Sequence, residues 1–261
     1  MCRLFGLYAN RGVNVQFSFY EAEKSLKKLS IKNPDGWGVA WFDNGWHLHK
    51  ESGPFYASKN ARRLAKNVFG VIIVSHVRKA THGGAKLENT HPWLYKGYVF
   101  AHNGTIRDRD KILELLSHEY LDLEGDTDSE TLFHLIVQET NNSNNFIEGV
   151  KRAIAKINAN NISYSSLNFI ASDGKKLYSL RYAEENLDYY TLFYLKRPRE
   201  GLRLEGLSEK TAQLIRMKLA SGEKAIIVAS EKLTKEPWES IPNKHMLIID
   251  ENLNAELVNI S

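Results

Sequence analysis

The sequence predicts an α/β (α+β) fold in which two mostly antiparallel sheets pack face to face, with helices on both outer faces. Three observations support this prediction. Strand-like apolar runs are joined by hairpin-type turns and do not alternate strictly with helices. Helical spacing of apolar residues gathers in two places, after Ser18 and after Asp110. Two packed sheets have two outer faces, one for each group of helices.

The first hundred residues contain most of the predicted hairpin strands. The apolar run at residues 4–8 predicts a strand that holds the N-terminus at the end of a sheet. Helical spacing between residues 18 and 30 predicts one helix. The turn formers Asp43-Asn44-Gly45 predict a hairpin. The other elements predicted here are a helix at 61–65 and strands at 39–42, 46–49, 71–77 and 98–101.

The rest of the chain reads as a helical segment followed by more strands. Helical spacing predicts helices at 110–117, 128–139 and 145–157. The turn Ser172-Asp173-Gly174 predicts a second hairpin. No repeat or linker separates these elements, so we expect one domain over residues 1–261. The remaining predictions are a helix at 207–220 and strands at 167–171, 176–182, 189–194, 225–229, 246–249 and 255–258.

Composition limits the class of protein. The 261 residues are 43% hydrophobic and 25% charged, which is ordinary for a globular protein. A net charge of +4 with dispersed basic residues predicts neither nucleic acid nor membrane as a partner. No run approaches the roughly 18 apolar residues of a membrane span, and no signal-peptide pattern is present. The single cysteine excludes an intrachain disulfide, so we expect a cytoplasmic protein.

That single cysteine is the second residue. Methionine is normally removed before a small side chain, so we expect Cys2 to become the N-terminal residue. It would then carry both a thiol, with a pKa of about 8.5, and an α-amine, with a pKa of about 7.7–8.0. The amine is a suitable base for the thiol, which makes Cys2 a candidate nucleophile. The alternative is that Cys2 is a small buried apolar residue.

Polar residues gather in loops after the predicted strands, at 78–84, 89–93, 102–104 and 125–128. Arg78 follows a buried strand, where a guanidinium is costly unless it binds a group such as a carboxylate. Asn103 and Gly104 form either an oxyanion hole or a turn with positive φ. Asp128 either caps the following helix or pairs with a substrate ammonium group, or does both.

Four histidines raise the alternative of a zinc site. His76, His82, His91 and His102 lie within 27 residues, and zinc accepts imidazole ligands. Their spacing matches no compact zinc motif such as H-E-x-x-H. We therefore interpret them as hydrogen-bonding supports of the loops, and keep a zinc hydrolase as the weaker alternative.

Six motifs in this order resemble the class II glutamine amidotransferases, whose glutaminase domain belongs to the N-terminal-nucleophile hydrolases. The resemblance is to the stand-alone glutaminase-domain branch, because residues 228–238 extend it into the second half and leave no room for a synthase. The six motifs are Met1-Cys2-Arg3-Leu4-Phe5-Gly6, Asp35-Gly36-Trp37-Gly38, His76-Val77-Arg78-Lys79-Ala80-Thr81-His82-Gly83, Asn89-Thr90-His91-Pro92-Trp93, His102-Asn103-Gly104 and Asp126-Thr127-Asp128-Ser129-Glu130.

The resemblance implies a four-layer αββα sandwich and a reaction. Cys2 would attack the γ-carbonyl of glutamine or of a related γ-glutamyl compound, with its own amine moving the proton. Asn103 and the Gly104 N–H would hold the tetrahedral oxyanion. Water would then release glutamate from the γ-glutamyl thioester. The family needs no metal and no organic cofactor.

The resemblance also implies how the substrate is held. Arg78, helped by Thr81 and His82, would bind the α-carboxylate, and Asp128 the α-ammonium group. Where one branch of the family has tryptophan after this arginine, the present chain has Lys79. The resemblance implies an ammonia-accepting protein partner. Separately, an exposed sheet edge would allow a homodimer, but the sequence does not locate such an edge. The alternative function is a non-catalytic glutamine-binding or regulatory subunit. The leaving group is unassigned, and we expect loops 83–88 and 196–206 to select it.

Overall fold

The computed structural model describes residues 2–80, 84–199 and 201–260. Its strands form two sheets, both antiparallel in every pairing between neighbouring strands. The strands are β1 (Arg3–Val13), β2 (Trp37–Phe42), β3 (Trp46–Glu51), β4 (Gly70–Val77), β5 (Trp93–Tyr95), β6 (Tyr98–Asn103), β7 (Asn168–Ser172), β8 (Leu177–Arg181), β9 (Phe193–Arg197), β10 (Ala225–Ala229), β11 (Glu239–Ser240), β12 (His245–Ile249) and β13 (Ala255–Asn259).

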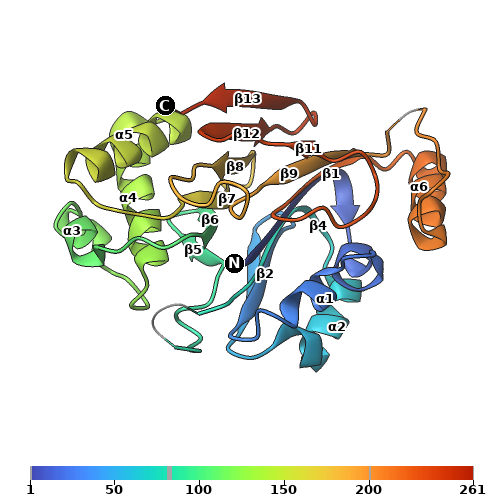
Figure 1. The fold of residues 1–261 in the computed structure, drawn as a ribbon, viewed down its shortest axis with the longest axis horizontal. Coiled ribbons are helices and arrows are strands. Elements are labelled where there is room, and N and C mark those ends of the chain that lie inside the picture. Colours follow the sequence, from blue (N-terminus) through green and yellow to red (C-terminus); the bar gives the residue numbers. More distant parts are fainter. Residues whose placement is uncertain (1, 81–83, 200, 261) are drawn as a thin grey trace.

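The seven-stranded sheet has the order β11-β9-β10-β1-β4-β2-β3, and the six-stranded sheet has the order β13-β12-β8-β7-β6-β5. In the first sheet, β1 is paired with β4 on one side and with β10 on the other. Strands from the end of the chain, β9 to β11, therefore form one half of this sheet, strands β2 to β4 form the other half, and β1 lies at its centre between them (Figure 1).

Helices lie on the outer faces of both sheets, which gives the predicted four-layer αββα order (Figure 1). The helices α4 and α5 cover the six-stranded sheet, whereas η1, α1 and α2 cover the seven-stranded sheet. The helical segments are η1 (Phe17–Glu21), α1 (Leu26–Ser30), η2 (Phe55–Ala57), α2 (Lys59–Asn67), α3 (Arg109–Leu113), η3 (His118–Tyr120), α4 (Asp128–Ser143), α5 (Phe146–Ala159) and α6 (Glu209–Ser221).

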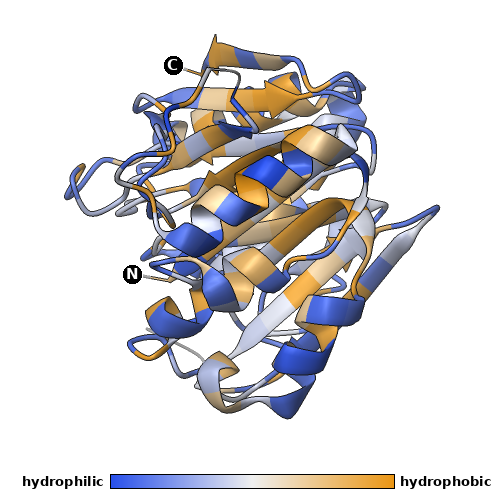
Figure 2. Cartoon of the chain, turned by 90° about the vertical axis from the view of Figure 1, so that its right-hand side faces the viewer, coloured by the Kyte–Doolittle hydropathy of each residue, from blue (hydrophilic) through white to orange (hydrophobic). Residues whose placement is uncertain are grey.

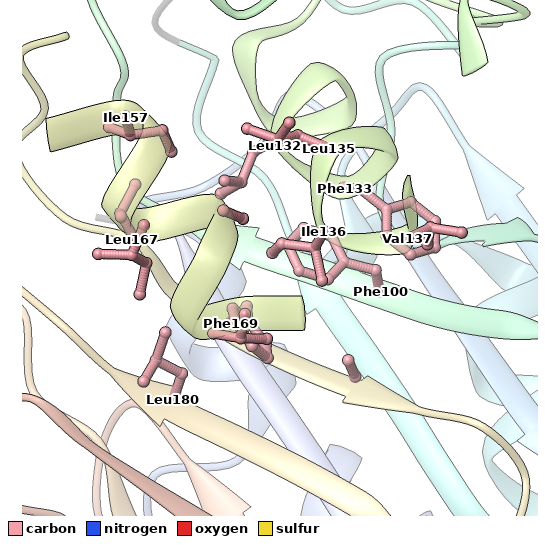
Figure 3. Close-up of a cluster of buried hydrophobic side chains, with 14 of the residues drawn as sticks. Phe100, Leu132, Phe133, Leu135, Ile136, Val137, Ile157, Leu167, Phe169 and Leu180 are labelled. Atoms are coloured by element: carbon pink, nitrogen blue, oxygen red, sulfur yellow. The ribbon is translucent and has the colours of Figure 1, made fainter. Parts of the chain in front are cut away.

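Three layers of buried apolar side chains hold the sandwich together. One lies between the sheets, from residues such as Leu4, Val74 and Ile170. A second lies between the six-stranded sheet and α4 and α5, where Phe100 and Phe133 stack (Figure 3). The third lies under η1, α1 and α2. Figure 2 shows the consequence, with mostly hydrophobic strands inside and hydrophilic residues on loops and outer helix faces.

Most predicted elements are present, several with different ends. The hairpin at Asp43-Asn44-Gly45 is confirmed, and Asn44 has the positive φ that such a turn needs. The hairpin through Gly174 is also confirmed, with a φ of 82°. The first strand runs to Val13, five residues beyond its predicted end, because it pairs with two neighbours. Strands β5 and β11 are not predicted by the sequence.

Two predicted elements are wrong. The helix at 18–30 is split into η1 and α1 because tertiary contacts hold the link between them: the Lys24 N–H donates to the Leu233 carbonyl over 2.9 Å. The strand predicted at 189–194 begins only at Phe193. Residues 189 and 190 form a turn, and both of their N–H groups donate to the Asn186 carbonyl.

None of the described helices is long and apolar enough to cross a membrane.

Candidate active site

A cavity of about 220 Å³ lies where the ends of both sheets meet, and it brings together five of the seven predicted site residues. Thr81 and His82 lie outside the described residues. A larger cavity of about 640 Å³, between α6 and strands β1 and β10, contains none of the predicted site residues. The smaller cavity is lined by Cys2, Arg78, Lys79, His91, His102, Asn103, Gly104, Thr105, Thr127, Asp128, Ser129, Tyr189 and Tyr190.

Strand register places Cys2 beside Arg78. The pairing of β1 with β4 aligns Arg3 with Val77, so Cys2 and Arg78 continue neighbouring strands beyond that pair. The next residues then fold around the thiol. The Lys79 N–H donates to Cys2 Sγ over 3.3 Å, and Sγ lies 3.5 Å from the Lys79 carbonyl oxygen.

The loop that touches the thiol is held from the opposite side by Asp35. The Asp35 carboxylate accepts the Ala80 N–H over 2.9 Å, and the Asp35 N–H donates to the Arg78 carbonyl over 3.1 Å. Gly36 accepts the Arg78 N–H over 2.8 Å. The motif that begins at Asp35 therefore sets the path of the backbone around Cys2.

Burial raises the pKa of the half-buried Cys2 thiol above its usual value. The hydrogen bond from Lys79 and the positive charges of Arg78 and Arg3 act in the opposite direction. A thiol needs a base under these conditions, since the thiolate is the reactive form.

Arg78 is 5% exposed, and its Nη1 donates to the Gly84 carbonyl. Burial lowers the pKa of Arg78, whereas the charges of Cys2, Asp35 and Asp128 raise it. A buried guanidinium that lines a cavity is suited to binding a carboxylate.

Asn103 is the last residue of β6 and Gly104 follows it, and both line the cavity. Neither has a positive φ, so the alternative of a left-handed turn is wrong. The Asn103 side chain is buried, and its Nδ2 has no hydrogen-bond partner in the structure. A Cβ on Gly104 would lie 1.8 Å from the Ser166 carbonyl oxygen, so only glycine fits. The site therefore contains a buried amide donor without a partner.

Asp128 does not cap its helix. The N-cap of α4 is Thr127, whose Oγ1 accepts the Glu130 N–H, so the capping alternative for Asp128 is wrong. Asp128 is instead the first residue of α4, and its Oδ2 accepts the Ile106 N–H over 2.6 Å. This contact turns the carboxylate toward the loop after β6, beside the cavity.

Three of the four histidines form a buried row next to the site. The His76 and His91 rings are in contact with their centroids 4.1 Å apart and their planes tilted by 31°, and His91 lies at the same distance from Trp93 with a tilt of 45°. His91 Nδ1 accepts the backbone N–H of His102. The His102 ring bonds to the Ser129 hydroxyl and the Ser166 carbonyl, so the predicted supporting role fits His91 and His102.

His76 does not fit that role, because neither of its ring nitrogens has a hydrogen-bond partner. Burial lowers the pKa of His76 and of His91 well below the usual value, and the charge of Arg78 acts in the same direction. His82 lies outside the described residues. Within the described ranges, no group of three or more histidine, cysteine, aspartate or glutamate side chains is placed to hold a metal ion.

Sequence reasoning missed Tyr189 and Tyr190, which complete the wall of the cavity. Their apolar neighbours suggested a strand, and nothing local indicates that a loop between β8 and β9 reaches the thiol. The sequence signal that could have identified a loop here is Asn186, because asparagine favours turns with positive φ, and Asn186 does have a positive φ.

Comparisons with known proteins show which family the chain resembles as a whole. The family model described as glutamine amidotransferases class-II matches residues 1–258. An uncharacterized protein of Methanocaldococcus jannaschii is 30% identical over 99% of this chain and 71% of its own length.

Two solved structures share the fold over the whole chain. A glutamine aminotransferase class-II domain protein from Silicibacter pomeroyi is 20% identical, with a TM-score of 0.67 and full coverage of both chains. The glutamine phosphoribosylpyrophosphate amidotransferase of B. subtilis is 19% identical, with a TM-score of 0.68, and the present chain spans 49% of its length. Similarity at this level of identity concerns the fold alone, and it agrees with the predicted four-layer αββα sandwich.

Proposed function

Because the chain belongs to the class II glutamine amidotransferases, we propose that it hydrolyses the γ-amide of glutamine or of a related γ-glutamyl compound through a thioester on Cys2. The observation that carries the proposal is the buried Asn103 Nδ2, which has no partner and lines the same cavity as the thiol. A buried amide donor without a partner is costly, and an oxyanion formed beside Cys2 would satisfy it.

The first half of the reaction forms the thioester. Removal of Met1 leaves the Cys2 amine free to take the thiol proton. The sulfur then attacks the γ-carbonyl carbon, and the oxyanion accepts hydrogen bonds from Asn103 Nδ2 and the Gly104 N–H. As the oxyanion collapses, the carbon–nitrogen bond breaks, and the departing nitrogen takes the proton from the Cys2 amine.

The second half of the reaction releases glutamate. Water attacks the thioester carbon, its proton passes to the Cys2 amine, and the same two donors stabilise the second oxyanion. The carbon–sulfur bond then breaks and the thiol recovers its proton. With glutamine as substrate the other product is ammonia, which is free to reach solvent or an ammonia-accepting partner protein.

The charged groups of the cavity suit the amino-acid end of the substrate. Arg78 binds the α-carboxylate, since a planar guanidinium matches two carboxylate oxygens. Asp128 binds the α-ammonium group, and its bond to the Ile106 N–H keeps the carboxylate in place. We include Thr81 and His82 beside Arg78 on the sequence resemblance alone.

We also propose that residues 1–261 act as one glutaminase-type domain. Sheet order supports this, because β1 lies between β10 and β4. The C-terminal strands therefore complete the sheet that carries Cys2, and a chain cut after α5 would leave β1 with an unpaired edge.

The test is glutamate release from L-glutamine by protein whose intact mass confirms loss of Met1. We expect Cys2→Ala to reduce the rate at least about 10³-fold, as expected for loss of a nucleophile. Protein that keeps Met1 is the matched control, and it should be similarly inactive because its amine is blocked. Full activity in Cys2→Ala would overturn the mechanism. Binding of glutamine without any turnover would favour the non-catalytic subunit.

A further inference from the structure

The loop between β8 and β9 places an aromatic and apolar surface at the cavity that holds Cys2. Tyr189 and Tyr190 both line that cavity, and their rings meet edge to face with centroids 5.1 Å apart. Tyr189 remains 48% exposed, and Leu187 on the same loop is 46% exposed. Large apolar side chains left exposed beside a site are candidates for ligand contact.

This loop has no regular structure, yet its backbone is held in place by Arg181. The guanidinium of Arg181 donates to three carbonyl oxygens: Nε to Tyr190 over 3.1 Å, Nη2 to Leu187 over 2.9 Å and Nη1 to Ile241 over 2.9 Å. Asn168 Nδ2 donates to the same Tyr190 carbonyl over 3.2 Å. An ordered backbone lowers the entropy cost of binding a ligand against the exposed rings.

The loop is also tied to the segment that follows the proposed oxyanion donors. The Tyr190 hydroxyl bonds to Ser165 Oγ over 2.9 Å, and the same Oγ accepts the Thr105 N–H over 3.1 Å. Thr105 follows Gly104 directly. The aromatic surface is therefore fixed relative to the place where the scissile amide would lie.

Tyr189 and Arg78 both line the cavity of the Cys2 thiol, but the other charged groups near them differ. Burial raises the pKa of Tyr189, and Tyr190, Arg3 and Cys2 also act on it. The charged groups that act on the pKa of Arg78 include Cys2 together with Asp35, Asp126 and Asp128. Arg78, Asp128, Tyr189 and Tyr190 all line the cavity that holds Cys2, so charged groups for an amino-acid head and an aromatic surface are present in one site.

Cavity size gives the direction of the substrate. At about 220 Å³ the cavity is smaller than the roughly 300–1,000 Å³ of sites that enclose drug-sized ligands. A γ-glutamyl head held by Arg78 and Asp128 would occupy much of it. A substituent on the γ-amide nitrogen would extend beyond this head, and the half-exposed Tyr189 ring, which lines the same cavity, offers it an apolar contact.

We infer that Tyr189 and Tyr190 form a leaving-group subsite, which receives an apolar or aromatic substituent on the γ-amide nitrogen. The inference rests on the proposed function and names its substrate class: γ-glutamyl amides of apolar or aromatic amines. The reaction is the thioester cycle described above, with the substituted amine leaving in place of ammonia after it takes the proton. A primary amide has no such substituent, so it makes no use of the subsite.

The test compares kcat/KM for γ-glutamyl-p-nitroanilide and L-glutamine in protein without Met1. Tyr189→Ala is expected to lower the anilide-to-glutamine ratio about tenfold, whereas Tyr189→Phe keeps the ring and the ratio. The matched control is Tyr56→Ala, because Tyr56 is 42% exposed on η2 and does not line the cavity; it should leave the ratio unchanged. An unchanged ratio in Tyr189→Ala overturns the inference.

A binding measurement separates this inference from the proposed function. Calorimetry with Cys2→Ala, which cannot form the thioester, should show tighter binding of the anilide than of L-glutamine, and adding Tyr189→Ala should remove the difference. Cys2-dependent hydrolysis of glutamine without any preference for binding the anilide overturns the subsite and leaves the proposed function standing. If the protein without Met1 hydrolyses neither substrate but binds the anilide in a manner that depends on Tyr189, the proposed function is wrong and the subsite stands. If the anilide does not bind at all, the subsite is wrong.

Discussion

The Lys79 N–H donates a hydrogen bond to the Cys2 sulfur over 3.3 Å, although the two residues are 77 positions apart. The contact depends on the pairing of β1 with β4, which brings both strand ends to the same point. It also depends on Asp35, which holds the next N–H, that of Ala80. The Cys2 thiol is thus positioned by the backbone of the loop that carries Arg78.

We predict that, in protein that keeps Met1, the alkylation rate of Cys2 rises only at a higher pH than that of a free thiol. Burial raises the pKa of the thiol, and only the thiolate reacts with iodoacetamide. The alkylation rate should therefore reach its midpoint above the pH of about 8.5 that is typical of a free thiol. Loss of Met1 places an ammonium group on the same residue and should lower this midpoint. A midpoint at or below that of a free thiol, with Met1 present, would contradict the prediction.

We predict that Gly104→Ala lowers both stability and activity. The new Cβ would lie 1.8 Å from the Ser166 carbonyl oxygen, so β6 and the segment before β7 must separate. The expected loss is at least about 1–3 kcal/mol in the free energy of unfolding, measured by urea denaturation. Gly45→Ala is the control, because nothing lies within 4 Å of its new Cβ. Equal stability of the two variants would show that the close approach is wrong.

We predict that Arg78→Ala chiefly raises KM for L-glutamine. A charge-assisted hydrogen bond contributes about 1.5–3 kcal/mol, which corresponds to roughly 10- to 100-fold in affinity. The carboxylate is bound equally in the ground and transition states, so kcat should fall less than kcat/KM. Arg62→Ala, at an exposed position on α2, is the control for loss of one positive charge. An unchanged KM would remove Arg78 from the substrate-binding role.

We predict that breaking the ion pair of Arg197 and Glu236 strongly lowers the free energy of unfolding. The two side chains are 3% and 1% exposed, and they form two hydrogen bonds with each other. Arg197→Met leaves an unpaired buried carboxylate and should cost about 3–5 kcal/mol in urea unfolding. Arg152→Ala breaks an exposed pair with Glu148 and should cost about 0.5 kcal/mol or less.

The double variant Arg197→Met with Glu236→Met checks the physical reason. Removing both charges removes the desolvation cost, so much of the stability should return. If the double variant is no more stable than Arg197→Met, the loss comes from packing and not from the unpaired charge.

We predict that stability falls steeply as the pH falls below about 6.5, the usual pKa of histidine. Burial lowers the pKa of His76, His91 and His102 in the folded protein, so there they stay neutral while the unfolded chain takes up protons. Each such histidine contributes stability that is present above about pH 6.5 and is lost by about 1.4 kcal/mol per pH unit below it.

His76→Phe isolates one of these contributions. The His76 ring is fully buried without hydrogen bonds, so an apolar ring of similar shape should leave stability at pH 7 unchanged or higher. The slope of the free energy of unfolding between about pH 6.5 and 5 should fall by about 1.4 kcal/mol per unit. An unchanged slope would mean that His76 does not stay neutral in the folded protein.

The sequence by itself determined the class of fold and the order of the site loops. Hairpin turns such as Asp43-Asn44-Gly45 act through local backbone preference, and the helix at Phe146–Ala159 has a regular apolar face. Both signals depend on neighbours a few residues away, so they can be read without a structure. Motifs around Cys2, Arg78 and Asn103 likewise identified which loops to expect together.

Only the tertiary structure decided how those loops meet. Thr127, and not Asp128, caps α4, and the Asp128 carboxylate turns to the Ile106 N–H, 22 residues away. Tyr189 lines the cavity of the Cys2 thiol because Arg181 and Asn168 donate hydrogen bonds to the carbonyl of its neighbour Tyr190 and hold the loop there. Contacts between residues far apart in the chain leave no periodic trace in the sequence. Pairing, burial and side-chain bonds across the sandwich therefore set the geometry of the site.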